Sequence, residues 1–98
     1  MSKAVIVRYR TSEEAAAENP RLVEQVYAEL HADQPDGLRY MTLRLADGVT
    51  FVHVAFHAED DNPLTRSAAF AAFQADLRDR VVEPPQPSAA SVVGSYGF

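Results

Sequence analysis

The sequence predicts a single α+β domain whose elements follow in the order β-α-β-β-α-β, and three patterns carry this prediction. Two strand-like runs flank Asp47-Gly48, the dipeptide that most strongly signals a tight hairpin. One stretch with helical spacing of apolar residues precedes this hairpin, and another follows it. Apolar runs near both ends are typical of a first and a last strand. The length of 98 residues suits one domain, which we take to span residues 1–98.

The first two elements are expected to be a strand and a helix. Ala4–Arg10 has the β-branched content of a strand that is largely buried on both faces. Thr11-Ser12-Glu13-Glu14 has the spacing of a capping box and predicts a helix start. Asn19-Pro20 either kinks this helix or begins a second segment with Asn19 as its cap. The helix is expected to end at Gln34–Gly37, and its apolar stripe consists of Leu22, Val23, Val26, Tyr27 and Leu30.

The hairpin signal predicts a register and therefore two distinct faces. If Asp47-Gly48 is a two-residue loop, Thr42 lies opposite His53 and Tyr40 lies opposite Ala55. The face expected to form the core carries Arg39, Met41, Leu43, Leu45, Thr50, Val52, Val54 and Phe56. The face expected to line a semi-polar cavity carries Leu38, Tyr40, Thr42, Arg44, Phe51, His53, Ala55 and His57.

The remainder of the chain is expected to contain a second helix and a last strand. Asn62-Pro63 or Ser67 can cap the helix. The three prolines of Glu83–Pro87 are expected to stop it and to form an extended connector. Ser91–Phe98 is then expected to be the last strand. The apolar face of the helix consists of Phe70, Phe73, Leu77 and Val81.

This element order is that of ferredoxin-like folds, in which two helices cover one face of a four-stranded antiparallel sheet. The other face would then present Tyr40 and Phe51 from the hairpin, and Tyr96 and Phe98 from the last strand. An apolar surface of this size is typical of an association site. We therefore expect a homodimer whose two sheets pack face to face as an α+β barrel and enclose a cavity.

The composition argues against several classes of partner. With nine basic and fourteen acidic residues, a net charge of −5 and no basic run, the chain lacks the field that favours nucleic acid. The apolar run after Lys3 is too short for a signal peptide or a membrane span. The sequence contains no Cys, which is compatible with a reducing compartment. We therefore expect a cytoplasmic protein that binds neither nucleic acid nor membrane.

The whole chain resembles the dimeric α+β barrel proteins, in particular the antibiotic-biosynthesis-monooxygenase-like group. The resemblance rests on the element order and on the segments AENPRLVEQVYAEL, RYMTLRLADGVTFVHV, NPL with AFAAFQADLRDR, and VVGSYGF. It implies a dimeric barrel. The superfamily includes cofactor-independent oxygenases of phenolic or quinol-like polyketides, haem-degrading enzymes, isomerases, dehydratases and proteins without known catalysis, so the fold does not select one activity.

Individual residues narrow what the resemblance implies. Oxygenases of the group often use a Trp or an Asn on the inner sheet face, but this chain has no Trp, and Asn19 and Asn62 lie at predicted helix starts. Haem-degrading members usually need a His on or near the second helix, and Arg66–Val82 has none. The chain also lacks a dinucleotide-binding or phosphate-binding loop. We therefore expect no cofactor.

His53 is the main candidate for chemistry, because an imidazole in the middle of the semi-polar face can accept a proton from a phenol or enol. The resulting anion could react with O₂ directly. The alternative is a wall histidine that is hydrogen-bonded to Thr42 or to water. Tyr40 could donate a hydrogen bond to a developing oxyanion, and Arg8 could pair with an anionic substrate if its side of the first strand faces the barrel. Phe51 and Tyr96 are expected to shape the pocket or the dimer contact.

No metal site is expected, because His53 and His57 lie four residues apart on one strand, roughly 13 Å at 3.3 Å per residue. The acidic loop Glu59-Asp60-Asp61 lacks the pattern of an EF-hand. Two functions remain open. One is a cofactor-independent monooxygenase-like enzyme that acts on a small aromatic or polyketide-like compound in the barrel cavity. The other is a non-catalytic dimeric protein that binds a small ligand.

Overall fold

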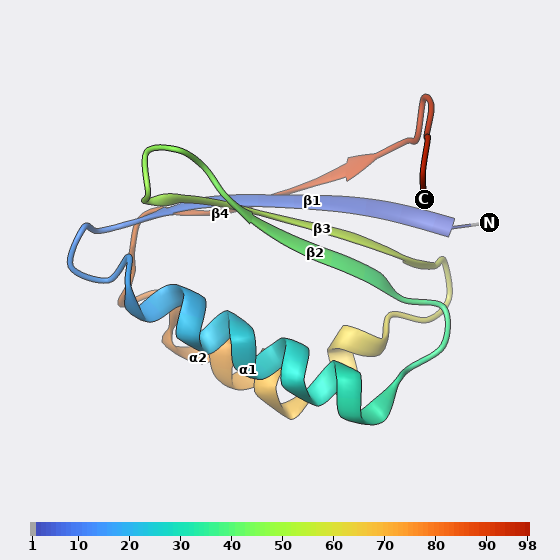
Figure 1. Cartoon of the computed structure of the whole chain (residues 1–98), viewed down its shortest axis with the longest axis horizontal. Coiled ribbons are helices and arrows are strands. Elements are labelled where there is room, and N and C mark those ends of the chain that lie inside the picture. Colours follow the sequence, from blue (N-terminus) through green and yellow to red (C-terminus); the bar gives the residue numbers. More distant parts are fainter. Residues whose placement is uncertain (1) are drawn as a thin grey trace.

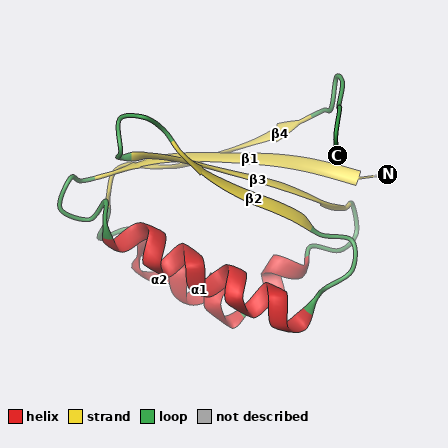
Figure 2. Cartoon of the chain, viewed as in Figure 1, coloured by secondary structure: helices red, strands yellow, loops and turns green. Residues whose placement is uncertain are grey.

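The computed structural model describes residues 2–98 and contains the predicted ferredoxin-like arrangement. Its elements are β1 (Ser2–Thr11), α1 (Glu18–Asp33), β2 (Arg39–Arg44), β3 (Thr50–Ala58), the 3-10 helix η1 (Pro63–Arg66), α2 (Ala68–Leu77) and β4 (Val81–Ala90). The strands form one antiparallel sheet in the order β2-β3-β1-β4. Both α-helices lie against the same face of this sheet, so the chain forms two layers (Figures 1 and 2). The predicted ferredoxin-like βαββαβ fold class is confirmed.

The hairpin of β2 and β3 has the predicted register. Tyr40 pairs with Ala55, and Thr42 pairs with His53. The loop is longer than predicted, because the Leu45 amide donates to the Thr50 carbonyl and four residues lie between these two. Gly48 adopts a φ of 78° in this loop, a conformation that glycine tolerates without strain. The Asp47 carboxylate accepts hydrogen bonds from the Val49 and Thr50 amides, which fixes the turn.

The two faces of the hairpin are the reverse of the prediction. Phe51 lies on the helix side and is only 2% exposed, whereas Met41 and Leu43 lie on the opposite side and are 44% and 45% exposed. Both faces are rich in apolar residues, so the pattern alone did not show which one the helices cover. The large rings and hydrogen-bonded polar groups of Tyr40, Phe51 and His53 fill the space under the helices instead.

The first helix begins later than the predicted capping box. The Ser12 hydroxyl accepts from the Ala15 amide, and the Thr11 hydroxyl donates to the Val49 carbonyl, so neither side chain caps a helix. α1 begins at Glu18 with Pro20 in its first turn, where a proline is favoured because it lacks an amide hydrogen. This start is close to the second of the two predicted alternatives, although Asn19 is fully buried and caps nothing.

Both predicted caps of the second helical region are present. The Asn62 side chain caps η1, and the Ser67 hydroxyl accepts from the Phe70 amide at the start of α2. The Glu29 carboxylate of α1 accepts hydrogen bonds from the Ser67 hydroxyl and from two amides of this first turn, so it links the two helices. α2 ends at Leu77, earlier than predicted.

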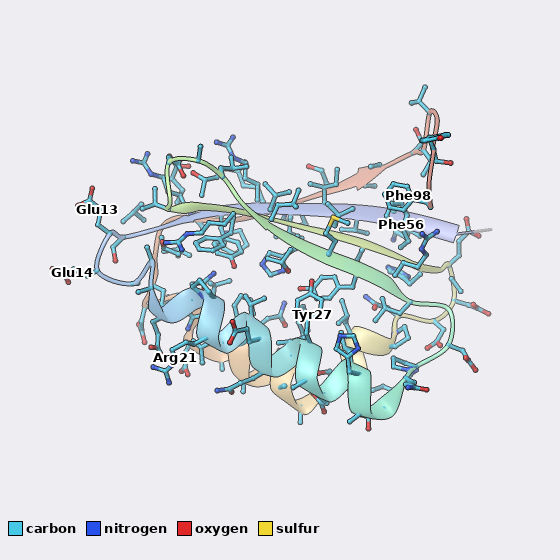
Figure 3. The ribbon with its side chains drawn as sticks, viewed as in Figure 1. Glu13, Glu14, Arg21, Tyr27, Phe56 and Phe98 are labelled. Atoms are coloured by element: carbon cyan, nitrogen blue, oxygen red, sulfur yellow. The ribbon has the colours of Figure 1, made fainter. Side chains whose placement is uncertain are left out.

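The last strand is where the prediction was wrong. β4 spans Val81–Ala90 and contains the three prolines that were expected to form a connector, whereas Ser91–Phe98 has no regular structure. β4 is an edge strand, the place in a sheet that tolerates proline because its outward amides need no partner. Tyr96 is 99% exposed in the terminal segment. Phe98 lies beside Phe56 on the sheet face away from the helices (Figure 3), and the Arg39 guanidinium lies over its ring.

The hydrophobic core lies between the sheet and the helices. It joins β1, β3, α1 and α2, and η1 closes it. Its buried members are Tyr9, Val23, Val26, Phe51, Ala55, Leu64, Phe73 and Leu77. This layer therefore holds the predicted cavity face of the hairpin, and a site built on that face lies within a single chain, not between two packed sheets.

Candidate functional site

His53 lies at the centre of a buried cluster of polar side chains between the sheet and the helices. It projects from the middle of β3 and is only 6% exposed. Its Nε2 atom is 2.8 Å from the Tyr9 hydroxyl. Its Nδ1 atom is hydrogen-bonded to the Tyr40 hydroxyl and lies 3.3 Å from the Thr42 hydroxyl. Both ring nitrogens therefore have partners within the protein.

The cluster extends through β1 and α1 to a buried arginine. The Asn19 amide nitrogen donates to the Tyr9 hydroxyl at 2.8 Å, and the Asn19 carbonyl oxygen accepts from Arg80 Nε at 3.1 Å. The Arg80 guanidinium also donates to the Phe73 carbonyl and lies 5.1 Å from the centre of the Phe73 ring. Every buried side-chain nitrogen and oxygen of the described residues has a partner, as a stable polar interior requires.

A second branch leads from His53 to α1. The Thr42 hydroxyl is 2.9 Å from the Tyr27 hydroxyl, and Tyr27 points from α1 toward the sheet (Figure 3). The Tyr27 ring stacks on the ring of Tyr40 with 5.2 Å between the centroids. This stacking fixes the plane of Tyr40, whose hydroxyl touches His53.

The arginine gives the chain of hydrogen bonds a direction. Because a guanidinium only donates, Asn19 must accept with its carbonyl and donate with its amide to Tyr9. The Tyr9 hydroxyl accepts from Asn19, so its own hydrogen is placed to be donated to His53 Nε2. A neutral His53 then carries its hydrogen on Nδ1, facing Tyr40 and Thr42. This order leaves the Tyr40 hydrogen free of His53, so that it can be donated to the neighbouring Thr42 hydroxyl or to a ligand.

Burial keeps the cluster neutral around the arginine. It lowers the pKa of His53 to about 4 and raises the pKa of Tyr9 to about 12. Burial also raises the pKa of Tyr40 and of Tyr27 above their usual values. The charged form of each group loses hydration in the interior, which is the largest cause in all four cases. At neutral pH His53 is therefore an uncharged imidazole among protonated phenols.

A cavity of about 490 Å³ lies beside this cluster, between α2 and the strands β1 and β3. Tyr9, Tyr40 and His53 line one part of it. Most of the wall is apolar and includes Val5, Val7, Ala55, Leu64, Phe70, Phe73 and Leu77. The cavity is open to solvent, and the exposed residues of its lining are Thr65, Ala71, Gln74 and Pro85. Its size and lining are typical of a pocket for a small organic molecule.

The structure brings together only part of the predicted site. His53 and Tyr40 line the cavity, and Thr42 contacts His53. Phe51 is in the core, stacked on Tyr9, and does not line the cavity. Arg8 is exposed on the sheet face away from the helices, and Tyr96 lies in the exposed terminal segment, so neither is at the cavity.

The sequence reasoning did not identify four residues of the cluster as part of the site. One of them, Tyr27, was assigned only to the apolar stripe of the first helix. Tyr9 carried a signal, because it follows Val5 and Val7 at alternate positions of β1 and so shares their face. Asn19 was interpreted only as a helix cap. Arg80 ends the charged segment Asp76–Arg80, and nothing in this segment distinguished it from a surface residue.

Within residues 2–98, no three His, Cys, Asp or Glu side chains gather in a group that could hold a metal ion. No helix of this stretch is long and apolar enough to cross a membrane.

Comparison with known proteins gives matches at the level of structure. No protein-family model matches the sequence, and no curated protein matches it. Rv0793 from Mycobacterium tuberculosis matches with a TM-score of 0.76 and 19% identity, over 97% of this chain and 98% of that one. A Nitrosomonas europaea protein provisionally named an antibiotic biosynthesis monooxygenase matches with a TM-score of 0.79 and 15% identity, over 98% and 94%.

A third match is to a protein with a stated activity. SnoaB, a cofactor-independent oxygenase from Streptomyces nogalater, matches with a TM-score of 0.71 and 16% identity, over 99% and 98% of the two chains. The chain shares the fold of these proteins. The resemblance to the antibiotic-biosynthesis-monooxygenase-like group is thus confirmed at the level of structure, across essentially the whole chain.

The low pKa of His53 predicts a specific dependence of stability on pH. The unfolded imidazole has a pKa of about 6.5, and the folded one has a pKa of about 4. As the pH falls through this window, the unfolded state binds a proton that the folded state does not, so the free energy of unfolding decreases. Above about pH 6.5 the free energy of unfolding is therefore higher than below about pH 4, and the difference caused by His53 is about 3 kcal/mol by linkage.

The measurement is urea unfolding of the wild type and of His53→Gln at fixed protein concentration, from about pH 7.5 to about pH 4. We expect the stability advantage of the wild type to shrink by up to about 3 kcal/mol across this range. The carboxyl groups of Glu29, Asp47 and Asp61, whose pKa values are lowered, titrate in both proteins and cancel in the difference. A difference that does not change with pH would contradict a neutral, buried His53.

Proposed function

We propose that this protein is a cofactor-independent oxygenase that acts on a small hydroxylated aromatic or polyketide-like compound in the cavity beside His53. The observation that carries the proposal is the cavity itself. It joins a hydrogen-bonded histidine and two tyrosines to an apolar wall with the rings of Phe70 and Phe73. Such a wall suits a flat aromatic body, and the polar part suits an oxygen substituent. The shared fold with SnoaB supports the same class of reaction.

The reaction needs no electrons from outside. A substrate with a methylene carbon activated by a neighbouring phenol or ketone loses a proton, and the resulting carbanion transfers electrons to O₂. A C–O bond forms, and the hydroperoxide then loses water to give a ketone. Overall the carbon loses two hydrogens and gains one oxygen atom, and the other oxygen atom leaves as water. The substrate is oxidised and O₂ is reduced.

The cluster supplies a route for the proton. The Tyr9 hydroxyl accepts the substrate proton as its own hydrogen passes to His53 Nε2, and Tyr40 donates to the developing substrate oxyanion. With a His53 pKa of about 4, taking a proton from an ordinary phenol costs about 8 kcal/mol. This cost is below the barrier of about 16 kcal/mol for a turnover of about 10 per second. More acidic conjugated substrates react at lower cost.

The alternative is a non-catalytic protein that binds a small ligand in the same cavity. One observation favours it. Both nitrogens of His53 already have hydrogen-bond partners, and its low pKa makes it a weak base. In that case Tyr40 and His53 would orient a ligand without transferring a proton.

Oxygen uptake with a panel of hydroxylated naphthalenes and anthrones separates these two functions. If His53 is the terminal proton acceptor, His53→Ala should reduce uptake by about 10²-fold or more, with folding confirmed by circular dichroism. His31→Ala is the matched control, because His31 is an exposed histidine in the last turn of α1. Equal rates in wild type and His53→Ala would remove His53 from the mechanism. No uptake with any compound would favour the binding protein.

We also propose that the chain forms a homodimer through the sheet face that the helices leave uncovered. This face presents a group of apolar side chains that are exposed or only partly buried, namely Ile6, Met41, Leu43, Val52 and Val54. Contiguous apolar surface of this kind is typical of an association site. The cavity lies on the other side of the sheet, so each subunit would hold its own cavity.

Sedimentation at low micromolar concentration should show twice the sequence mass of 10.8 kDa. Leu43→Asp places a charge in the proposed contact and should shift the protein to monomer or unfold it. Ala72→Asp is the control, because Ala72 is exposed on α2 at the opposite side of the molecule. A folded wild-type monomer under these conditions would contradict the dimer.

A further inference from the structure

His57 lies farther along the same strand and on the same face as His53. It is only 7% exposed, although it is close to the end of β3. It lines the cavity together with Asn62 and Thr65, which follow β3 in the chain. The cavity thus extends along β3 from the cluster around His53 to a second polar region around His57.

The tautomer of the neutral His57 ring follows from a contact with the backbone. Its Nδ1 atom is 2.7 Å from the Ala58 carbonyl oxygen. A carbonyl only accepts, so Nδ1 must carry the hydrogen. In the neutral ring, Nε2 is then an acceptor with a free lone pair.

This acceptor has no partner within the described residues, where the only hydrogen bond of the His57 ring is made by Nδ1. Every fully buried side-chain nitrogen of the described residues has a hydrogen-bond partner. Since Nε2 has none, it is not a fully buried atom. The side chain as a whole is more than nine-tenths buried and lines the cavity, and Nε2 is the ring position that has no protein partner and is not fully buried.

We propose that His57 is a specificity-determining residue that accepts a hydrogen bond from the far end of an elongated ligand. The proposal rests on the proposed function of the cavity and adds the shape of its ligand. Tyr40 offers a hydrogen to an oxygen at one end, and His57 accepts a hydrogen from a hydroxyl at the other. The Tyr40 hydroxyl contacts His53, and the backbone positions of His53 and His57 are four residues apart on β3, roughly 13 Å at about 3.3 Å per residue.

The space between these ends is apolar, because Val5, Ala55 and Phe70 line it. A ligand with two fused aromatic rings and a hydrogen bond at each end spans roughly the 13 Å that separates the backbone positions of His53 and His57. The ligand class is therefore a flat aromatic compound of two or three fused rings with an oxygen acceptor at one end and a hydroxyl donor at the other. A ligand without that hydroxyl leaves Nε2 of His57 unpaired, which lowers its affinity.

The test compares two ligands that differ only in the far hydroxyl, 6-methoxy-2-naphthol and 2-methoxynaphthalene, by anaerobic titration calorimetry. We expect the wild type to bind the naphthol about tenfold more tightly, the size of one hydrogen bond. His57→Phe keeps a ring in place and should reduce this preference to about twofold or less. His31→Phe, at an exposed histidine of α1, should leave the preference unchanged.

Because oxygen is absent, the result does not depend on whether the protein is an oxygenase. Lack of oxygen uptake would refute the proposed enzyme and leave this binding preference intact. The inference is overturned if the wild type fails to bind the naphthol or shows no preference for it. This result depends on the wild type alone and not on the folding of a variant. It is also overturned if a folded His57→Phe keeps the full preference.

Discussion

The burial of a neutral histidine between the sheet and the helices is the constraint on which the rest of this structure depends. A polar ring in the interior needs a partner for each nitrogen, and His53 finds them in Tyr9 and Tyr40. These phenols need partners of their own, and the chain of bonds ends at the buried guanidinium of Arg80. The burial of this one residue of β3 thus requires polar side chains on three other elements, β1, β2 and α1, and one just after α2.

This cluster connects the fold to the site. Tyr9 belongs to β1 and Tyr40 to β2, Asn19 lies in the first turn of α1, and Arg80 follows α2. The site is therefore complete only when both helices lie on the sheet. A buried cation without a carboxylate partner is unfavourable for stability alone, and Arg80 has none among the ion pairs of the described residues. Its positive charge does, however, lower the pKa of Tyr9 against the effect of burial, which favours a proton leaving that phenol.

Much of this arrangement could be predicted from local sequence, because short-range signals determined it. Asp47-Gly48 was sufficient for the register that brings Thr42, Tyr40 and His53 together. The identity of the buried face was not predictable, because both faces are apolar and only the helices decide between them. The prolines of β4 were misinterpreted, because their tolerance depends on edge position in the sheet, a property of tertiary structure. Arg80 was missed for the same reason, since its partner Asn19 is distant in sequence.

The central claim, that His53 stays neutral and hydrogen-bonded at both nitrogens, is tested most directly by nitrogen NMR of the protein with labelled histidine. The His53 signals can be assigned by their loss in His53→Gln. The account predicts one protonated and one unprotonated ring nitrogen, with no change in their shifts from about pH 8 down to about pH 5. A His53 that titrates near its ordinary pKa of about 6.5 would contradict it, because such a ring would be solvated and free of the chain that ends at Arg80.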